Sequence, residues 1–218
     1  MGGTSIDISK LTLDGERGTL FRLLIPNLIK EDKLLYLDCD LIVNLDIAEL
    51  WDIDLAGHAL AAVRDTCSLA YLEGSPISWR YKMIWNLMNV KPDSYFNAGV
   101  ILMNLKKIRT EYCFLKNVES FYDKFKKCIT LADQDCLNYV FSGDVLYVDG
   151  KFNRMDTDKY ADNVSKSIWH MAGVSKPWTM CSVGSVDELY WHYLSRTAYC
   201  SIRDEFISLM GSMLASSP

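Results

Sequence analysis

A short apolar run that ends in two carboxylates constrains this chain more than any other stretch. Leu34–Leu37 is predicted to be a strand, and Asp38-Cys39-Asp40 follows it directly. Strand side chains alternate between two faces, so both carboxylates point the same way if the strand continues, and a bend would still leave both at its carboxyl end. Ligands bind at that end in open α/β sheets. A partly buried carboxylate pair needs a metal ion, a proton or a basic side chain to compensate it. An acidic turn explains the same residues without a ligand.

The apolar segments alternate between strands and helices along the chain. Strands are predicted at 34–37, 59–64, 99–105 and 145–148. The third is apolar almost throughout, which indicates burial on both faces. Helices are predicted at 19–29, 111–127, 133–141, 185–197 and 201–213. Residues 66–94 show little periodicity and are predicted to leave the sheet as a long excursion that contains, at most, a short helix. The alternation of predicted strands and helices along the chain favours an α/β fold.

Composition narrows the class of protein. Hydrophobic residues make up 50% of the chain and charged residues 23%, as in an ordinary globular domain. The formal net charge of −5 argues against nucleic acid as a partner. The seven cysteines form no Cys-x-x-Cys pair, which favours free thiols in a reducing compartment. No secretion signal and no apolar run of about 20 residues is seen, so the cytoplasm is the expected location.

Two further polar clusters occur next to predicted elements. Asn97-Ala98 precedes the third predicted strand. The Asn97 amide could bind a hydroxyl-rich ligand, but an Asx turn that enters the strand is the simpler explanation of this motif alone. Asp133-Gln134 opens a predicted helix, where acidic residues are expected for capping alone. The glutamine is harder to explain in that way.

A last cluster combines an imidazole with a positive charge. His170 follows a short apolar piece, Gly173 permits close approach of the backbone, and Lys176 supplies a positive charge beside Pro177-Trp178. That arrangement suits a diphosphate, although a single histidine is more often a structural residue than a ligand. Together with Asp38 and Asp40, His170 would form a mixed oxygen and nitrogen site that suits manganese.

Four segments in order resemble glycosyltransferase family 8: LLYLDCDLIV, YFNAGVILMNLKKIR, ADQDCLNYVF and HMAGVSKPW. The resemblance runs from about residue 19 to about residue 200. It implies a GT-A fold, here a mixed sheet flanked by helices in one domain of residues 1–218. Residues 19–180 would form the core with the metal and diphosphate site, and 181–218 a C-terminal helical extension.

The resemblance implies a retaining transferase that moves glucose or galactose from UDP-glucose or UDP-galactose to a glycan or a lipid-linked saccharide, as in lipopolysaccharide synthesis. Mn²⁺ is the implied cofactor, with Mg²⁺ as the alternative. The implied metal ligands are Asp38, Asp40 and His170. Donor contacts fall on Arg22, Asp38, Asn97, Ala98, Gly173 and Lys176. Catalytic positions fall on Gln134 and Asp133, and an acid on the acceptor side falls on Asp65.

Family members begin with a further βα unit that binds the nucleoside, and residues 1–18 contain no such unit. The expectation is therefore a shortened chain, whose exposed sheet edge would favour a homo-oligomer. One alternative is an inactive or partner-dependent fragment. Another is a phosphotransferase with Asp38 as nucleophile and Asp40 as acid/base. Aromatic residues at 190, 191, 193 and 199 fit either core packing or peripheral contact with the inner face of a membrane.

Overall fold

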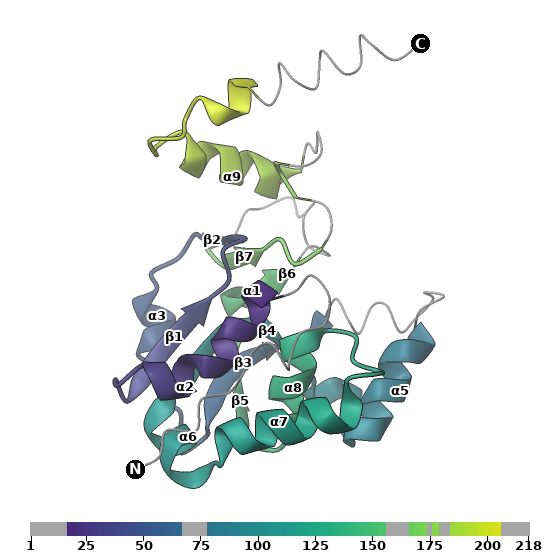
Figure 1. Ribbon diagram of the computed structural model, residues 1–218. Coiled ribbons are helices and arrows are strands. Elements are labelled where there is room, and N and C mark those ends of the chain that lie inside the picture. The colour runs from purple at the N-terminus through teal and green to yellow at the C-terminus, as the bar shows by residue number, and fades with distance from the viewer. Residues whose placement is uncertain (1–16, 67–77, 156–165, 174–175, 179–183, 206–218) are drawn as a thin grey trace, which may run out of the picture.

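A four-stranded mixed sheet forms the centre of the protein. The computed structural model describes residues 17–66, 78–155, 166–173, 176–178 and 184–205 (Figure 1). The strands lie in the order β1 (Lys33–Leu37), β4 (Phe96–Asn104), β3 (Leu60–Arg64) and β5 (Val145–Tyr147). β4 runs antiparallel to both of its neighbours, and β5 runs parallel to β3. Every residue of β4 except its last is buried, which confirms the prediction of a strand covered on both faces.

A second, smaller sheet continues from the end of β1. Its strands lie in the order β2 (Leu41–Val43), β7 (Ile168–His170) and β6 (Arg154–Met155). β2 is antiparallel to β7, with Leu41 paired to His170. None of the three was among the predicted strands, because two or three residues are too few to show a periodicity. This sheet brings the histidine segment next to the acidic turn.

Helices cover one face of the large sheet. The segment α1 (Arg17–Leu20), η2 (Phe21–Leu24) and α2 (Ile25–Leu28) packs there with α5 (Ser78–Met88), α6 (Leu105–Glu111), α7 (Phe114–Phe125) and α8 (Ala132–Val140). These helices enclose the largest apolar cluster, to which β4 contributes Ala98, Ile101 and Met103. In Figure 1, α7 and α8 lie next to each other on this side of the sheet, and α8 contacts β4.

The opposite face of the large sheet is covered mainly by short elements. Leu50 of α3 (Ala48–Trp51), Phe152 of η4 (Gly150–Phe152) and Ile168 of β7 pack against Val63 and Val100. α9 (Ser185–Leu194) lies beyond the small sheet, where Val186 packs with Trp169 and Met171. The chain therefore forms an α/β mixed-sheet fold, as predicted.

Several predicted boundaries were wrong. The helix over 19–29 is interrupted by the 3₁₀ turn η2, and Pro26 lies in the first turn of α2, where a proline is tolerated. β4 begins at Phe96, so Asn97 lies inside the strand and not before it. The predicted helix over 111–127 begins only at Phe114, after the unpredicted helix α6. In the predicted excursion, α5 is helical and 67–77 lie outside the described residues.

The C-terminal part agrees with the prediction as far as it is described. α8, β5 and α9 confirm the elements predicted at 133–141, 145–148 and 185–197. Residues 202–205 are helical, and the remainder of the helix predicted at 201–213 lies outside the described residues. Among the described helices, none is long and apolar enough to cross a membrane.

Substitution in the centre of β4 should be far more damaging than substitution on the surface. Leu102 is 0% exposed, whereas Leu28 on α2 is 68% exposed. We expect Leu102→Ala to lower the free energy of unfolding by about 2–5 kcal/mol, because it leaves a cavity in a packed core. Leu28→Ala, the matched control, should change it by less than about 0.5 kcal/mol. Urea unfolding measures both, and equal effects would contradict this packing.

Candidate metal and sugar-nucleotide site

The acidic pair lies in a turn between the two sheets. β1 ends at Leu37, residues 38–40 form the turn, and β2 begins at Leu41. The backbone N–H of Asp38 donates to the carbonyl of Gly99 on β4 at 2.8 Å, and the carbonyl of Asp40 accepts from the N–H of Met171 at 3.0 Å. The strand thus bends instead of continuing, and both carboxylates still lie at its carboxyl end.

One ligand atom from each of Asp38, Asp40 and His170 converges on a common point. These three atoms lie within 4.8 Å of one another. His170 Nε2 is 3.4 Å from Asp40 Oδ1 and 3.9 Å from Asp38 Oδ2. Two carboxylate oxygens and an imidazole nitrogen are a donor set that suits Mn²⁺. The residues that the sequence predicted as metal ligands are therefore brought together.

The other oxygen of each carboxylate is held by a donor. Asp38 Oδ1 accepts from Arg22 Nη2 and from the Tyr36 hydroxyl, both at 2.7 Å. Asp40 Oδ2 accepts from Lys176 Nζ at 2.6 Å. Because the outer oxygens are occupied in this way, Asp38 Oδ2 and Asp40 Oδ1 are left to face His170. The pair is compensated on its outer side and open to a cation on its inner side.

The contacts of Asp40 keep it ionised. Burial by itself raises the pKa of the Asp40 carboxyl, but the adjacent His170 and Lys176 outweigh burial and hold that pKa well below its usual range. Lys176 also donates to the carbonyl of Met171, which ties the residue to the end of β7. Gly173 lies in the same loop, and 174–175 lie outside the described residues.

Close packing of β7 against β4 depends on Gly99. A Cβ atom at this position would lie 2.2 Å from His170 Cε1 and 2.8 Å from its Nδ1. Such distances are far inside van der Waals contact, so any larger residue would displace the imidazole. His170 itself is 5% exposed, and its ring packs over the backbone of the central strand.

Arg22 connects the acidic turn with α8. Its Nη2 binds Asp38, its Nη1 donates to the carbonyl of Ala98 at 2.6 Å, and its Nε pairs with Asp133 Oδ2 at 2.7 Å. Burial raises the pKa of Asp133 from 3.8 to about 6, although the Arg22 guanidinium lowers it. Asp133 is thus engaged by the arginine.

Gln134 is fixed between β4 and the end of β3. Its Oε1 accepts from the backbone N–H of Ala98 at 2.9 Å, and its Nε2 donates to Asp65 Oδ2 at 2.7 Å. Asn97 Nδ2 donates to the same oxygen of Asp65 at 3.4 Å. Asp65 is 2% exposed and orients both amides. These contacts place four of the predicted site residues in one hydrogen-bonded group.

Two groups at the site, the partly buried Tyr36 and the buried Asn153, were not predicted from the sequence. The Tyr36 hydroxyl donates to Asp38, and burial raises the pKa of that hydroxyl well above its usual range, so it stays a donor. The second group is Asn153, whose Oδ1 lies 2.9 Å from His170 Nδ1. The position of Tyr36 could have been predicted, since it lies two residues before Asp38 and strand residues alternate faces. The position of Asn153 could not, because it lies outside every predicted helix and strand.

Comparison with known proteins identifies the family. The profile of glycosyl transferase family 8 matches residues 12–181. The chain belongs to glycosyltransferase family 8. A putative glycosyltransferase of Haemophilus influenzae is 32% identical over 171 residues, which are 73% of this chain and 48% of that protein. The lipopolysaccharide 1,3-galactosyltransferase of Salmonella typhimurium is also 32% identical over 171 residues, 73% of this chain and 49% of that protein.

A solved structure shares the fold of this family 8 chain. The galactosyltransferase LgtC, crystallised with donor and acceptor sugar analogs, superposes with a TM-score of 0.72 at 25% identity, covering 88% of this chain and 74% of that one. The fold is therefore the GT-A-type fold that the resemblance implied. The chain spans about half the length of the two curated relatives. Membership of family 8 also shows that the phosphotransferase interpretation was wrong.

The raised pKa of Asp133 predicts a pH dependence of stability. Asp133 binds its proton more tightly in the folded protein than in the unfolded chain, so this stabilisation is complete below about pH 4 and is lost as the pH rises through about 6. The shift corresponds to about 3 kcal/mol at most. Urea unfolding of the metal-free protein between pH 4 and 7 should show this loss, and Asp133→Asn should remove it. The same pH slope in both proteins would contradict the assignment.

Proposed function

We propose that this chain is a Mn²⁺-dependent retaining glycosyltransferase that moves glucose or galactose from a UDP-sugar to a hydroxyl of a glycan or lipid-linked saccharide. The observation that carries the proposal is the convergence of Asp38 Oδ2, Asp40 Oδ1 and His170 Nε2, with each outer carboxylate oxygen held by a donor. The Salmonella relative is a lipopolysaccharide galactosyltransferase, which favours an acceptor of that class.

The described residues suit a diphosphate leaving group. When bound, the cation would supply positive charge beside the leaving diphosphate. Lys176 brings a second positive charge to the same place through its contact with Asp40, and Gly173 in the same loop leaves the backbone open to close approach. Arg22 binds Asp38 and so holds the second carboxylate of the proposed metal site in place.

The contacts of Gln134 and Asp133 bear on how the sugar is transferred. Both ends of the Gln134 amide are held, and Asp133 is paired with Arg22. Neither group is a strong nucleophile in that state, so we favour attack by the acceptor hydroxyl on the same face that the diphosphate leaves. The bond from the anomeric carbon to phosphate breaks, the bond to the acceptor oxygen forms, and the acceptor proton passes to a phosphate oxygen.

The location and the partners belong to the same proposal. The described cysteines are free, which supports a reducing compartment such as the cytoplasm. Of the aromatic residues considered for a membrane contact, Trp191 is buried and Tyr190 packs against Trp178, whereas Tyr193 and Tyr199 are 38% and 64% exposed. Peripheral contact would therefore rest on Tyr193 and Tyr199. Association between copies stays a prediction.

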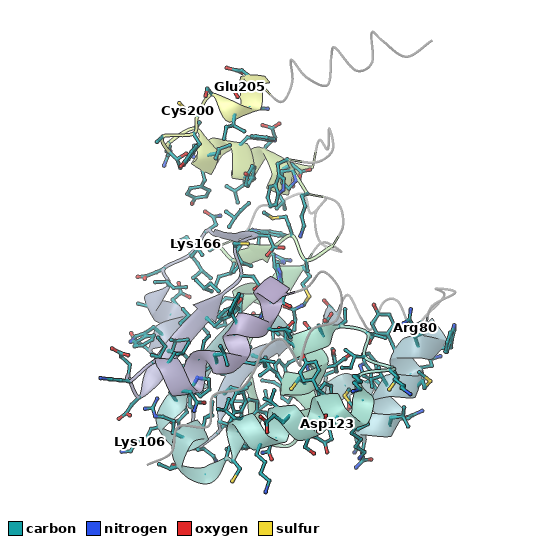
Figure 2. The ribbon with its side chains drawn as sticks, viewed as in Figure 1. Arg80, Lys106, Asp123, Lys166, Cys200 and Glu205 are labelled. Atoms are coloured by element: carbon teal, nitrogen blue, oxygen red, sulfur yellow. The ribbon has the colours of Figure 1, made fainter. Side chains whose placement is uncertain are left out.

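Loss of one metal ligand should abolish most of the activity. We expect Asp40→Ala to reduce Mn²⁺-dependent hydrolysis of UDP-glucose or UDP-galactose by roughly 10²-fold or more, as for other preorganised electrostatic groups. The matched control is Asp123→Ala, because Asp123 lies on the outer surface of α7, far from β7 (Figure 2). Equal rates for Asp40→Ala and the wild-type protein would reject the proposal.

Binding of UDP tests the site separately from catalysis. The fragment alternative is that the chain binds a donor without turning it over. In calorimetric titration we expect UDP to bind in the presence of Mn²⁺ and to bind much more weakly in EDTA. Binding without hydrolysis would favour a partner-dependent fragment, and equal binding with and without Mn²⁺ would contradict the metal site.

A further inference from the structure

We propose that Asn153 is a positioning residue that keeps the proton of His170 on Nδ1 and so turns the Nε2 lone pair toward Asp38 and Asp40. The inference rests on the proposed metal site and adds a residue that acts only through the imidazole. Asn153 lies just after η4, is 1% exposed, and touches both the central strand and β7. Its role follows from a chain of hydrogen bonds in which every direction is determined.

The chain of hydrogen bonds starts at the backbone of β4. The N–H of Gly99 donates to Asn97 Oδ1 at 2.9 Å. A backbone amide has only a donor to offer, so the atom that it meets must be the oxygen of the Asn97 side chain. At the other end of that side chain, Nδ2 faces the carboxylate of Asp65 at 3.4 Å, where only a donor is favourable. The orientation of the Asn97 amide is therefore set at both ends.

The orientation of Asn153 follows from that of Asn97. Asn153 Nδ2 lies 2.9 Å from Asn97 Oδ1, an acceptor, and donates to it. A flipped Asn153 amide would place two oxygens in contact. The Oδ1 atom of Asn153 consequently faces His170 Nδ1 at 2.9 Å. Since a side-chain amide oxygen only accepts, Nδ1 must carry the proton in neutral His170.

The proton on Nδ1 decides what the other nitrogen can do. Nε2 points at Asp40 Oδ1 and Asp38 Oδ2, which are both strong acceptors for a proton on this nitrogen. Without Asn153, these carboxylates would favour the tautomer protonated at Nε2, and that proton would block the ligand atom. Asn153 opposes them from the far side of the ring. Asn97, Asn153 and His170 are 6%, 1% and 5% exposed, so little water competes for these bonds.

The tautomer can be observed without metal, sugar nucleotide or turnover. The chain has three histidines, and His170→Gln identifies the resonances of His170 by their loss. In ¹⁵N-labelled, metal-free protein at pH 9, well above the ordinary pKa of imidazole, we expect a protonated Nδ1 and a bare Nε2. A proton on Nε2 of His170 in the wild-type protein would overturn the proposal.

Two substitutions of nearly equal shape separate positioning from packing. Asn153→Leu removes the acceptor, so the proton should move to Nε2 and the affinity for Mn²⁺, measured by the spin-resonance signal of free Mn²⁺, should fall about 10- to 100-fold. Asn153→Asp keeps an acceptor facing Nδ1, so it should keep the proton on Nδ1 and the affinity within about 3-fold, although its second oxygen lies against Asn97 Oδ1 and lowers the stability of the fold. Equal losses in both variants would show a packing role and reject the proposal.

The outcomes distinguish this proposal from the proposed function. If the wild-type protein binds no Mn²⁺, the metal-dependent function fails, while the tautomer of His170 still decides the role of Asn153. If Mn²⁺ binds and Asn153→Leu changes neither tautomer nor affinity, the function stands and Asn153 has no such role. Circular dichroism checks that each variant folds. Should Asn153→Leu fail to fold, the wild-type tautomer and the affinity of Asn153→Asp still support or overturn the proposal.

Discussion

The site depends on two carboxylates that lie close together, with donors bound to the oxygens that face away from His170. Asp38 and Asp40 present ligand atoms within 4.8 Å of each other and of His170. At a separation of 4.8 Å, two negative charges repel by about 3.5 kcal/mol when the effective dielectric constant is near 20. Arg22, Tyr36 and Lys176 offset this on the outer oxygens. The inner side keeps a negative potential, and a divalent cation is the group best able to satisfy it.

The same residue type behaves in opposite ways at this site because its surroundings differ. Asp40 accepts from Lys176 and lies beside His170, and both neighbours lower its pKa against the effect of burial. Asp133 is more deeply buried and has the Arg22 guanidinium, which Asp38 shares, so burial dominates and its pKa rises to about 6. Arg22 therefore pairs with two carboxylates, Asp38 beside the proposed cation site and Asp133 on α8. One positive charge does not neutralise both.

The sequence predicted the parts of the site that lie on regular, strongly patterned elements. Leu34–Leu37 and the centre of β4 are continuous apolar runs, and the helix that carries Gln134 opens with acidic residues. The polar residues beside these elements converge as expected. The boundary at Leu105 was missed, because the apolar run continues into α6, whose N-cap is the Asn104 side chain bonded to the N–H of Lys107. Asn104 is a typical N-cap residue and could have marked the start of a helix, but the apolar run through Leu105 favoured a longer strand.

Long-range contacts between isolated polar residues left no such pattern. Asn153 lies 56 residues from Asn97 and 17 from His170, and each contact is a single hydrogen bond between side chains. Periodicity reports which face of an element is buried, whereas a lone amide in an irregular segment reveals its partner only once the chain has folded. β2 and β7 also show no sequence pattern, because each has only three residues, yet their pairing places Leu41 opposite His170.

That pairing makes the site a junction between the two sheets. Asp38 follows the last residue of β1 in the large sheet, Asp40 precedes β2 in the small one, and His170 ends β7 in the small one. The His170 ring can approach the large sheet because Gly99 has no side chain at that point. A cation bound by all three residues would bridge the sheets, so binding would stabilise their packing as well as the ligand geometry. By mass action, a ligand at about 100 times its Kd adds about 2.7 kcal/mol to the folded state. The local order of this junction and its affinity for a cation are therefore thermodynamically linked, and residues that fix His170 act on both.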